Sequence, residues 1–286
     1  GRNTFHFYTE DMTTQAFEQV QMEANLRTAL QEHQLLVYYQ PQFDLSTGRL
    51  VGSEALVRWF HPSDGFIGPD RFLQAAEDCG LIIDIDEWVF RDVCRQLDLW
   101  QRQGIDMEGM RFAVNLSGGQ LKQSGLPSAF AEIIERSGCD PQVLELEITE
   151  GFIMHQPDLS TRILHQLREL GLHLSIDDFG TGYSSLSYLK QLPINKLKID
   201  RSFVMDIVED PSDAAIAKSV IALGHSMNLK VVAEGIETPE QEALLKAEGC
   251  DIGQGYMYSK PVSAKAFAKL MTAALDKQRD RLEQVN

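Results

Sequence analysis

Short runs rich in β-branched and aromatic residues alternate with longer segments of helical periodicity along most of the chain. The strand-like runs are Leu35–Gln40, Leu50–Val57, Met110–Leu116, Val143–Thr149, Leu172–Asp177, Ile194–Ile199, Lys230–Glu234 and Asp251–Tyr258. The helical patterns between them are Pro69–Asp78, Asp84–Gln103, Pro127–Ser137, Asp158–Leu170, Asp213–Met227 and Pro239–Glu248, with a last one from Ala264. This alternation predicts an α/β fold, a TIM-like (β/α)8 barrel.

One connection departs from the alternation. The segment Phe43–Gly48 (FDLSTG) is a polar turn, too short to contain a crossover helix. Because strands joined by a short turn pair antiparallel, we expect the first strand to run against the second. The prediction is therefore a barrel with an antiparallel first strand.

The length of 286 residues allows one large barrel or two ordinary domains. We expect the barrel at 26–270, a connecting N-terminal helix at 13–34 and an exposed helical tail at 271–286. The apolar stripe of the first helix either packs against the main body or belongs to a connector from an upstream domain. No apolar run approaches the ~20 residues that a membrane helix requires, so we expect no membrane contact by this fragment.

Polar residues share one face of the predicted strands. In the run VLELEIT, Glu145 and Glu147 alternate with apolar residues, so both carboxylates lie on the same face. Glu54, Asn115 and Asp177 stand in the same register on other strands. One such acid alone would be interpreted as a solvated edge residue. Its recurrence near the carboxyl ends of several strands, where barrel enzymes carry their active sites, predicts a functional site.

The polar residues at or near the last positions of different strands are Glu54, Asn115, Glu147, the pair Asp177 and Asp178, Lys198, Glu234 and Gln254. Carboxylates crowded together raise one another's pKa unless cations neutralise them. Ligands that are all oxygen atoms favour a hard ion, Mg²⁺ or Mn²⁺, over zinc.

The formal net charge of −16 argues against a protein that binds duplex DNA, which needs a basic face. Bound cations would then be needed to hold an anionic substrate. The four cysteines are scattered and form no C-x-x-C, which fits a cytoplasmic protein without a zinc site or disulfide framework. No G-x-S-x-G, P-loop or G-x-G-x-x-G motif is present, so serine hydrolases, NTPases and dinucleotide-cofactor enzymes are unsupported.

An ordered set of motifs carries a family resemblance: Gly52–Trp59 (GSEALVRW), Asn115–Ser117 (NLS), Glu147–Glu150 (EITE), Asp177–Gly182 (DDFGTG), Lys198–Asp200 (KID), Ala233–Glu237 (AEGIE) and Gln254–Tyr256 (QGY). The set resembles the EAL domain family, whose active members hydrolyse the bacterial second messenger cyclic di-GMP to linear pGpG. The opening Asn3–Tyr8 also resembles the last strand of a GGDEF domain, so 1–12 is expected to be the remnant of such an upstream domain.

The resemblance implies a phosphodiesterase with two ions, Mg²⁺ or Mn²⁺, per site, and it implies inhibition by Ca²⁺. The metal ligands that it assigns are Glu54, Asn115, Glu147, Asp177 and Asp178, with Asp177 bridging the two ions. Lys198 and Glu234 resemble the pair that orients or deprotonates the attacking water, and the sequence leaves open which is the base. The implied substrate contacts are Gln40, Arg58 and Gln254.

The segment Asp178–Leu186 resembles the family's mobile loop, which couples the metal site to a homodimer interface. The residues assigned to this coupling are Glu150, Phe179, Gly180, Thr181 and Gly182. Two alternatives remain open: a catalytically inactive receptor for cyclic di-GMP, and an unrelated metal-dependent barrel hydrolase. An inner-membrane anchor elsewhere in a full-length protein is left open too.

Overall fold

The computed structural model describes residues 10–182 and 186–283. These residues belong to two compact units, one formed from Gly1–Leu36 and Val57–Ile85 and the other from Val37–Leu56 and Asp86–Asn286. The segment compared with a GGDEF strand and residues 183–185 of the predicted loop lie outside the described residues. All candidate site residues except Arg58 fall in the larger unit.

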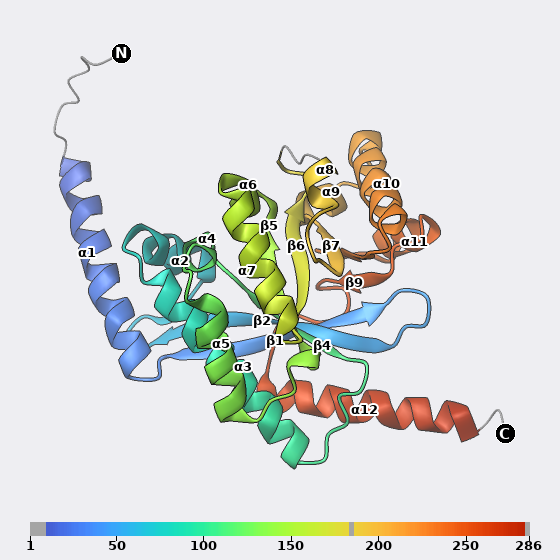
Figure 1. Ribbon diagram of the computed structural model, residues 1–286, viewed down its shortest axis with the longest axis horizontal. Coiled ribbons are helices and arrows are strands. Elements are labelled where there is room, and N and C mark those ends of the chain that lie inside the picture. Colours follow the sequence, from blue (N-terminus) through green and yellow to red (C-terminus); the bar gives the residue numbers. More distant parts are fainter. Residues whose placement is uncertain (1–9, 183–185, 284–286) are drawn as a thin grey trace. The chain divides into compact units, whose positions relative to one another are not determined.

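Within the described part of the chain, eight strands close into a barrel, which confirms the predicted fold class (Figure 1). They are β1 (Leu35–Asp44), β2 (Leu50–His61), β4 (Arg111–Asn115), β5 (Leu144–Thr149), β6 (His173–Phe179), β7 (Lys196–Ile199), β8 (Lys230–Ala233) and β9 (Ile252–Gln254). Their order is β1-β9-β8-β7-β6-β5-β4-β2, and a pairing between β1 and β2 closes the ring.

The first strand is antiparallel, as the short turn predicts. Strand β1 runs against β9, with Gln42 opposite Gln254, whereas the pairs from β2–β4 round to β8–β9 are parallel. The turn after β1 is held by Asp44, whose Oδ1 accepts hydrogen bonds from the backbone N–H groups of Ser46 and Thr47 at 3.1 and 2.8 Å. Gly48 takes the left-handed φ of 70° that ends this turn.

Longer helices alternate with the strands. They are α1 (Glu10–Gln31), α2 (Pro69–Asp78), α3 (Ile82–Arg102), α5 (Leu126–Ser137), α7 (Pro157–Glu169), α10 (Pro211–Ser226), α11 (Pro239–Ala247) and α12 (Ala264–Glu283). The first ends earlier than the expected Gln34, because His33 adopts φ 58°, which breaks the helical conformation.

Several short elements do not appear in the sequence prediction. They are β3 (Gly65–Ile67), α4 (Gly118–Leu121), a 3₁₀ turn (Pro141–Val143), α6 (Glu150–His155), α8 (Leu186–Leu189), α9 (Arg201–Met205) and β10 (Val262–Ser263). The last barrel strand is also shorter than the expected Asp251–Tyr258. It stops at Gln254 because the next residues turn back, with the N–H groups of Tyr258 and Ser259 donating to the Gly255 carbonyl.

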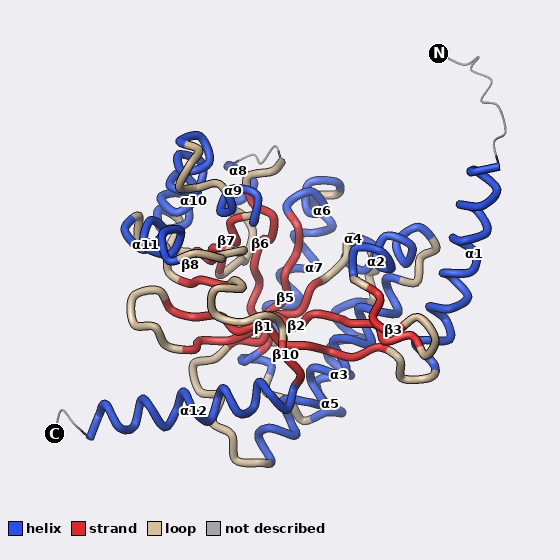
Figure 2. The backbone as a smooth tube through the Cα atoms, turned by 180° about the vertical axis from the view of Figure 1, so that it is seen from behind, coloured by secondary structure: helices blue, strands red, loops and turns tan. Residues whose placement is uncertain are grey.

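Helices flank the strands of the larger unit (Figure 2), and buried apolar side chains come from both. On β5, Leu144, Leu146 and Ile148 are fully buried, which leaves the alternate residues for the barrel interior. The ring of Tyr39 on β1 lies 5.0 Å from Trp100 on α3 and 5.7 Å from Phe267 on α12. The interior of the barrel is thus free to be polar.

The smaller unit has its own packing around Trp59. The end of β2 pairs antiparallel with β3, with Trp59 opposite Ile67. The Trp59 ring meets Phe72 of α2 edge-on at 5.7 Å, and its Nε1 donates to Gln34 Oε1 at 3.2 Å.

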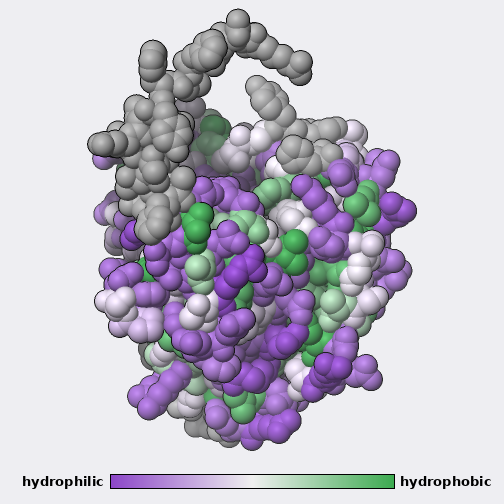
Figure 3. Space-filling model, turned by 90° about the vertical axis from the view of Figure 1, so that its left-hand side faces the viewer, coloured by the Kyte–Doolittle hydropathy of each residue, from purple (hydrophilic) through white to green (hydrophobic). Residues whose placement is uncertain are grey.

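Hydrophobic side chains on the face drawn in Figure 3 occur as small separate patches among hydrophilic ones. No helix in the described part of the chain is both long and apolar enough to span a membrane.

Candidate active site

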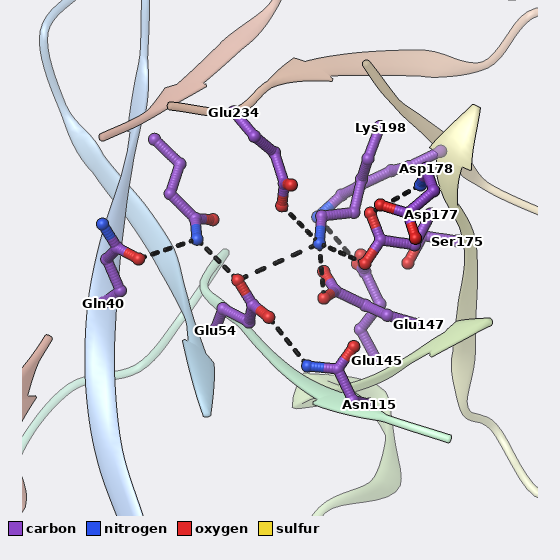
Figure 4. Close-up of polar contacts among 12 residues, drawn as sticks. Gln40, Glu54, Asn115, Glu145, Glu147, Ser175, Asp177, Asp178, Lys198 and Glu234 are labelled. Carbon is purple, nitrogen blue, oxygen red and sulfur yellow. Dashed lines mark hydrogen bonds and ion pairs between the residues drawn. The ribbon is translucent and has the colours of Figure 1, made fainter. Parts of the chain in front are cut away.

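Polar side chains from seven barrel strands, and from the residue directly after the eighth, gather toward the carboxyl ends of the parallel strands (Figure 4). They are Gln40 on β1, Glu54 on β2, Asn115 on β4, Glu147 on β5, Asp177 on β6, Lys198 on β7, Glu234 directly after β8, and Gln254 on β9. Strand register aligns them, since Asn115 lies opposite Glu147. The structure therefore brings together residues that the sequence placed on separate strands.

The Lys198 ammonium lies at the centre of this cluster and is fully buried (Figure 4). Its Nζ is 2.6 Å from Glu147 Oε2, 2.6 Å from Glu234 Oε1 and 3.1 Å from Asp177 Oδ2. Glu54 Oε2 lies further away, at 3.9 Å. One lysine thus connects acids from four different strands or strand ends.

This crowding shifts the pKa values of the lysine and of its partners. Burial alone would lower the pKa of Lys198, but the surrounding carboxylates outweigh it and raise that pKa well above its ordinary value. Burial and the neighbouring acids raise the pKa of Glu147 well above its ordinary value, and they raise the pKa of Glu234 to about 8. Lys198 therefore keeps its charge while two of its partners favour the protonated form.

Glu54 is instead held in its ionised form by amide donors. Asn115 Nδ2 donates to Glu54 Oε1 at 2.7 Å, and Gln254 Nε2 donates to Glu54 Oε2 at 2.6 Å. Burial opposes ionisation, but Lys198 and these two amides outweigh it and lower the pKa of Glu54. Gln254 Nε2 also lies 3.2 Å from Gln40 Oε1, so one amide connects three members of the predicted site.

Gln42 belongs to the same network and was not singled out in the sequence. It is buried, and its Nε2 donates to Gln254 Oε1 at 2.8 Å. Its position two residues after Gln40, on the inward face of β1, is the signal that identifies it.

An irregularity in β6 separates the two neighbouring aspartates. The register with β7 shifts between Ile176 and Phe179, and Asp178 has φ 54°, unusual for a residue other than glycine. Burial, Asp177 and Asp200 raise the pKa of Asp178 to about 6. The bulge gives Asp177 and Asp178 different surroundings although they are adjacent in sequence.

Two of the residues assigned to the loop, Gly180 and Gly182, lie against Glu150. The buried Glu150 accepts a hydrogen bond from the Gly180 N–H at 3.1 Å, and Gly182 is so close that an added Cβ would lie 2.8 Å from Glu150 Oε1. Thr181 Oγ1 donates to the Asp178 carbonyl at 2.8 Å, and Phe179 is buried as the last residue of β6.

Arg58 and Glu145 differ from the other acids and bases. Arg58 lies in the smaller unit, where its Nη1 donates to the Val57 carbonyl at 2.8 Å, so its predicted phosphate contact stays a prediction. Glu145 is no solvated edge residue: it is buried and pairs with Lys196 at 2.7 Å, one inward position before Glu147.

The donor atoms of the cluster suit a hard divalent cation. Glu54, Asn115, Glu147, Asp177 and Asp178 offer only side-chain oxygens as ligands to such an ion. Glu147 Oε1 is buried and has no hydrogen-bond partner among the described residues. The described part of the chain contains no group of three or more His, Cys, Asp and Glu side chains already arranged to hold a metal. Lys198 Nζ lies at the centre of the candidate ligands instead. The candidate ligands therefore fit a divalent cation by the chemistry of their donor atoms and by their charge.

Carboxylates, amides and a buried lysine lie at the carboxyl end of this α/β barrel. Barrel enzymes carry their active sites at this end, so the fold and the site define a protein of that class. More particularly, the chain belongs to the EAL domain family, whose model matches residues 23–261. The resemblance noted in the sequence is confirmed.

Proteins of similar sequence and solved structures of similar fold agree with this assignment. The chain is 44% identical over 273 residues to the cyclic di-GMP phosphodiesterase NbdA of Pseudomonas aeruginosa, covering 96% of this chain and 35% of that protein. It is 36% identical over 269 residues to the cyclic di-GMP phosphodiesterase PdeR of Escherichia coli, covering 94% and 40% respectively. The chain thus spans well under half the length of these relatives.

A solved structure described as the PaMucR phosphodiesterase in complex with c-di-GMP superposes with a TM-score of 0.83 at 44% identity. The match covers 86% of this chain and 99% of that one. The EAL domain of Mycobacterium smegmatis DcpA matches with a TM-score of 0.72 at 33% identity, over 84% and 98% of the two chains.

Proposed function

We propose that this chain is a divalent-metal-dependent phosphodiesterase that hydrolyses cyclic di-GMP to linear pGpG and so lowers the level of this second messenger. The observation that carries the proposal is the acidic cluster around Lys198, in which Glu54, Glu147, Asp177 and Glu234 lie within 4 Å of the ammonium and Asn115 donates to Glu54. The names of the relatives and the ligand of the PaMucR complex support the choice of substrate.

Two Mg²⁺ or Mn²⁺ ions would be held by Glu54, Asn115, Glu147, Asp177 and Asp178. When bound, such ions activate water and neutralise charge on a phosphodiester. They would also supply the positive charge that a chain of net charge −16 needs in order to bind a substrate with two phosphates.

The two candidates for handling the attacking water differ in their access to solvent. Glu234 lines a cavity of about 170 Å³ together with Gln40, Glu54 and Gln254, whereas Lys198 is fully buried behind them. We therefore assign proton exchange with water to Glu234 and the positioning of the carboxylates to Lys198. Cations near Glu234 would favour its ionised form, which can accept a proton.

A hydrolysis assay tests the proposal directly. The chain is incubated with cyclic di-GMP and Mg²⁺ or Mn²⁺, and pGpG is measured by chromatography. Glu54→Ala removes a proposed ligand and is expected to lower turnover by about 100-fold or more. Glu132→Ala, an exposed carboxylate on α5, is the matched control and should leave turnover unchanged.

Three results would contradict parts of the proposal. Absence of pGpG with both ions would contradict the enzyme activity, and binding without turnover would favour the receptor alternative. Turnover that persists in excess chelator would contradict metal dependence. Replacement of the ion by Ca²⁺ is expected to inhibit, since Ca²⁺ is larger and less strict in geometry. Homodimerisation remains a prediction, which sedimentation analysis of the chain can check.

A further inference from the structure

Two of the four cysteines lie close together in the larger unit, remote in role from the proposed hydrolysis. Cys94 is on α3, and Cys139 directly follows Gly138, the C-cap residue of α5. Both are free thiols and both are buried, with exposed fractions of 0% and 5%. Two thiols that meet in a fold can be oxidised to a disulfide, so the contacts around this pair decide whether it can react.

Helices α3 and α5 pack against each other along a stripe of α3 that includes Cys94. Four positions before it, the Phe90 ring stacks on Phe130 of α5, with ring centroids 3.8 Å apart and an interplanar angle of 6°. Four positions after it, Asp98 lies beside Gly138, where an added Cβ would be 4.0 Å from Asp98 Oδ1. Residues four apart share one face of a helix, so Cys94 faces the end of α5 between these two contacts.

The two thiols are in direct contact at this place. Cys139 Sγ donates to the Asp140 carbonyl at 3.6 Å, which leaves its sulfur free to accept from Cys94. The hydrogen bond between the thiols, together with burial, raises the pKa of the Cys94 thiol. Ser137 contacts both cysteines, since its Oγ accepts the Cys139 N–H at 3.3 Å and its hydroxyl forms a hydrogen bond with the Cys94 thiol. Sulfur atoms in such contact need only side-chain rotation to reach a bonding distance of about 2.0 Å.

The other two cysteines, which the described residues also include, have different surroundings. Cys250 Sγ donates to two backbone carbonyls at 3.5 Å, and Cys79 Sγ donates to a third at 3.7 Å. Cys79 also belongs to the smaller unit. Contact between thiols therefore distinguishes Cys94 and Cys139 from the remaining pair.

A cavity of about 280 Å³ adjoins the two thiols. It lies between α3 and α5, where Ser137 lines it together with Arg95 and Ile133. A small oxidant in this cavity meets a side chain that contacts both cysteines. Cys139 is the more exposed of the two, and Cys94 holds its proton more firmly, so Cys139 is the thiol placed to react first.

We propose that Cys94 and Cys139 are a redox-active dithiol that hydrogen peroxide converts to an intrachain disulfide. The Cys139 sulfur loses its proton and attacks one peroxide oxygen; the O–O bond breaks, and the departing hydroxide takes that proton to form water. The Cys94 sulfur then attacks the sulfur of the resulting sulfenic acid. The S–O bond breaks, and the departing hydroxide takes the Cys94 proton to form a second water. The two thiols lose two electrons in total, which reduce the peroxide, and a thiol reductant reverses the reaction.

The disulfide joins α3 to the segment that leads into β5. That segment runs from Cys139 through the 3₁₀ turn Pro141–Val143, and β5 carries Glu147. Closing a long loop by a covalent bond restricts the unfolded chain, so the oxidised protein is more stable than the reduced one. The inference goes beyond the proposed function and does not depend on it, because no atom of the acidic cluster takes part.

Peptide mass spectrometry tests the proposal. The reduced chain is treated with hydrogen peroxide, unfolded in a reagent that blocks free thiols, and digested without reductant. The expected product is the peptide of Cys94 linked to the peptide of Cys139, lighter by two hydrogen atoms than the two together, with no link to Cys79 or Cys250. The melting temperature should rise by roughly 5 °C on oxidation and return after treatment with dithiothreitol.

Cys139→Ser should lose both the linked peptide and the rise in melting temperature, whereas Cys79→Ser is the matched control and should keep both. Peroxide treatment of Cys139→Ser also accounts for any effect of methionine oxidation. Thermal unfolding of the reduced variants shows whether they are folded, and Cys139→Ala replaces a serine variant that is not. Unlinked Cys94 and Cys139 after oxidation of the wild type, a link to another cysteine, or a linked chain that melts no higher than the reduced one would overturn the proposal, whatever the outcome of the hydrolysis assay.

Discussion

Lys198 gives the candidate site its chemical character. Four carboxylates lie within 4 Å of its ammonium, so four negative charges and one positive charge leave a formal charge of −3 in a buried space. Such a cluster is costly unless protons or cations offset the charge. The raised pKa values of Glu147 and Glu234 reflect that cost.

Asp251, which directly precedes β9, offers a separate test of side-chain electrostatics. Its carboxylate accepts hydrogen bonds from Lys230 Nζ at 2.6 Å and the Val231 N–H at 3.0 Å, and it lies 2.9 Å from His225 Nε2. Partial burial opposes ionisation, but these partners outweigh it and lower the pKa of Asp251. Its stabilising contribution is therefore present above the ordinary aspartate pKa and is lost as the pH falls through the lowered value.

We expect Asp251→Asn to lower the free energy of unfolding by about 1 kcal/mol at neutral pH. Urea unfolding of both proteins across a pH series measures the difference. The gap should shrink toward acid pH, where the wild-type carboxylate becomes protonated. A gap that stays constant from neutral pH down to about pH 3 would contradict the assignment.

Individual residues differed in how far the sequence could place them. Period-two alternation was enough to predict that Glu145 and Glu147 share one face of their strand, because strand geometry fixes that relation. It could not show that Lys198 lies at the centre, since that depends on distances between strands. Nor could it place Arg58, which lies on the same strand as Glu54 but in the other compact unit.

At the level of elements, the contact between 235–237 and 254–257 supports both Glu234 and the wall of the 170 Å³ cavity that Glu234 lines. Gly255→Ala would place a Cβ 2.0 Å from the Ile236 carbonyl oxygen, which is backbone and cannot rotate away. We expect a loss of about 1–3 kcal/mol in the free energy of unfolding, from overpacking, together with lower turnover.

Gly125→Ala is the matched control for this substitution. Gly125 has φ −83°, and an added Cβ there meets no heavy atom within 4 Å. Because Gly125 is the N-cap residue of α5, where alanine is less favourable than glycine, we expect a loss of only about 0.5 kcal/mol at this position. Equal destabilisation by both substitutions, measured by urea unfolding, would show that the contact at Gly255 has no special weight.

Elements with a clear period were predictable and short ones were not. The helices over Pro69–Asp78 and Pro239–Ala247 agree with their sequence patterns to within one residue, because each begins with a proline and has several turns. A helix of six residues such as α6 spans too few turns to display a period. The early end of β9 depends on hydrogen bonds to Gly255 that no local pattern encodes.

For the barrel as a whole, the division between its two faces explains how an acidic lumen is tolerated. The outer strand faces and the helices provide the apolar core, including the Tyr39, Trp100 and Phe267 cluster, so stability does not depend on an apolar interior. The inner face is then available for the acids, at the cost of their repulsion. A cation bound there should stabilise the entire unit, since only the folded chain brings the ligands together.

We therefore expect Mg²⁺ or Mn²⁺ to raise the melting temperature of the chain. A ligand at 100 times its dissociation constant adds about 2.7 kcal/mol of stability, which corresponds to roughly 5–10 °C for a protein of this size. Calorimetry with and without the ion measures the shift, and NaCl at equal ionic strength controls for simple screening of the net charge of −16. Asp177→Asn should greatly reduce the shift, whereas Glu132→Ala should preserve it. An equal rise in all three proteins would locate the bound ions elsewhere than at the acids around Lys198.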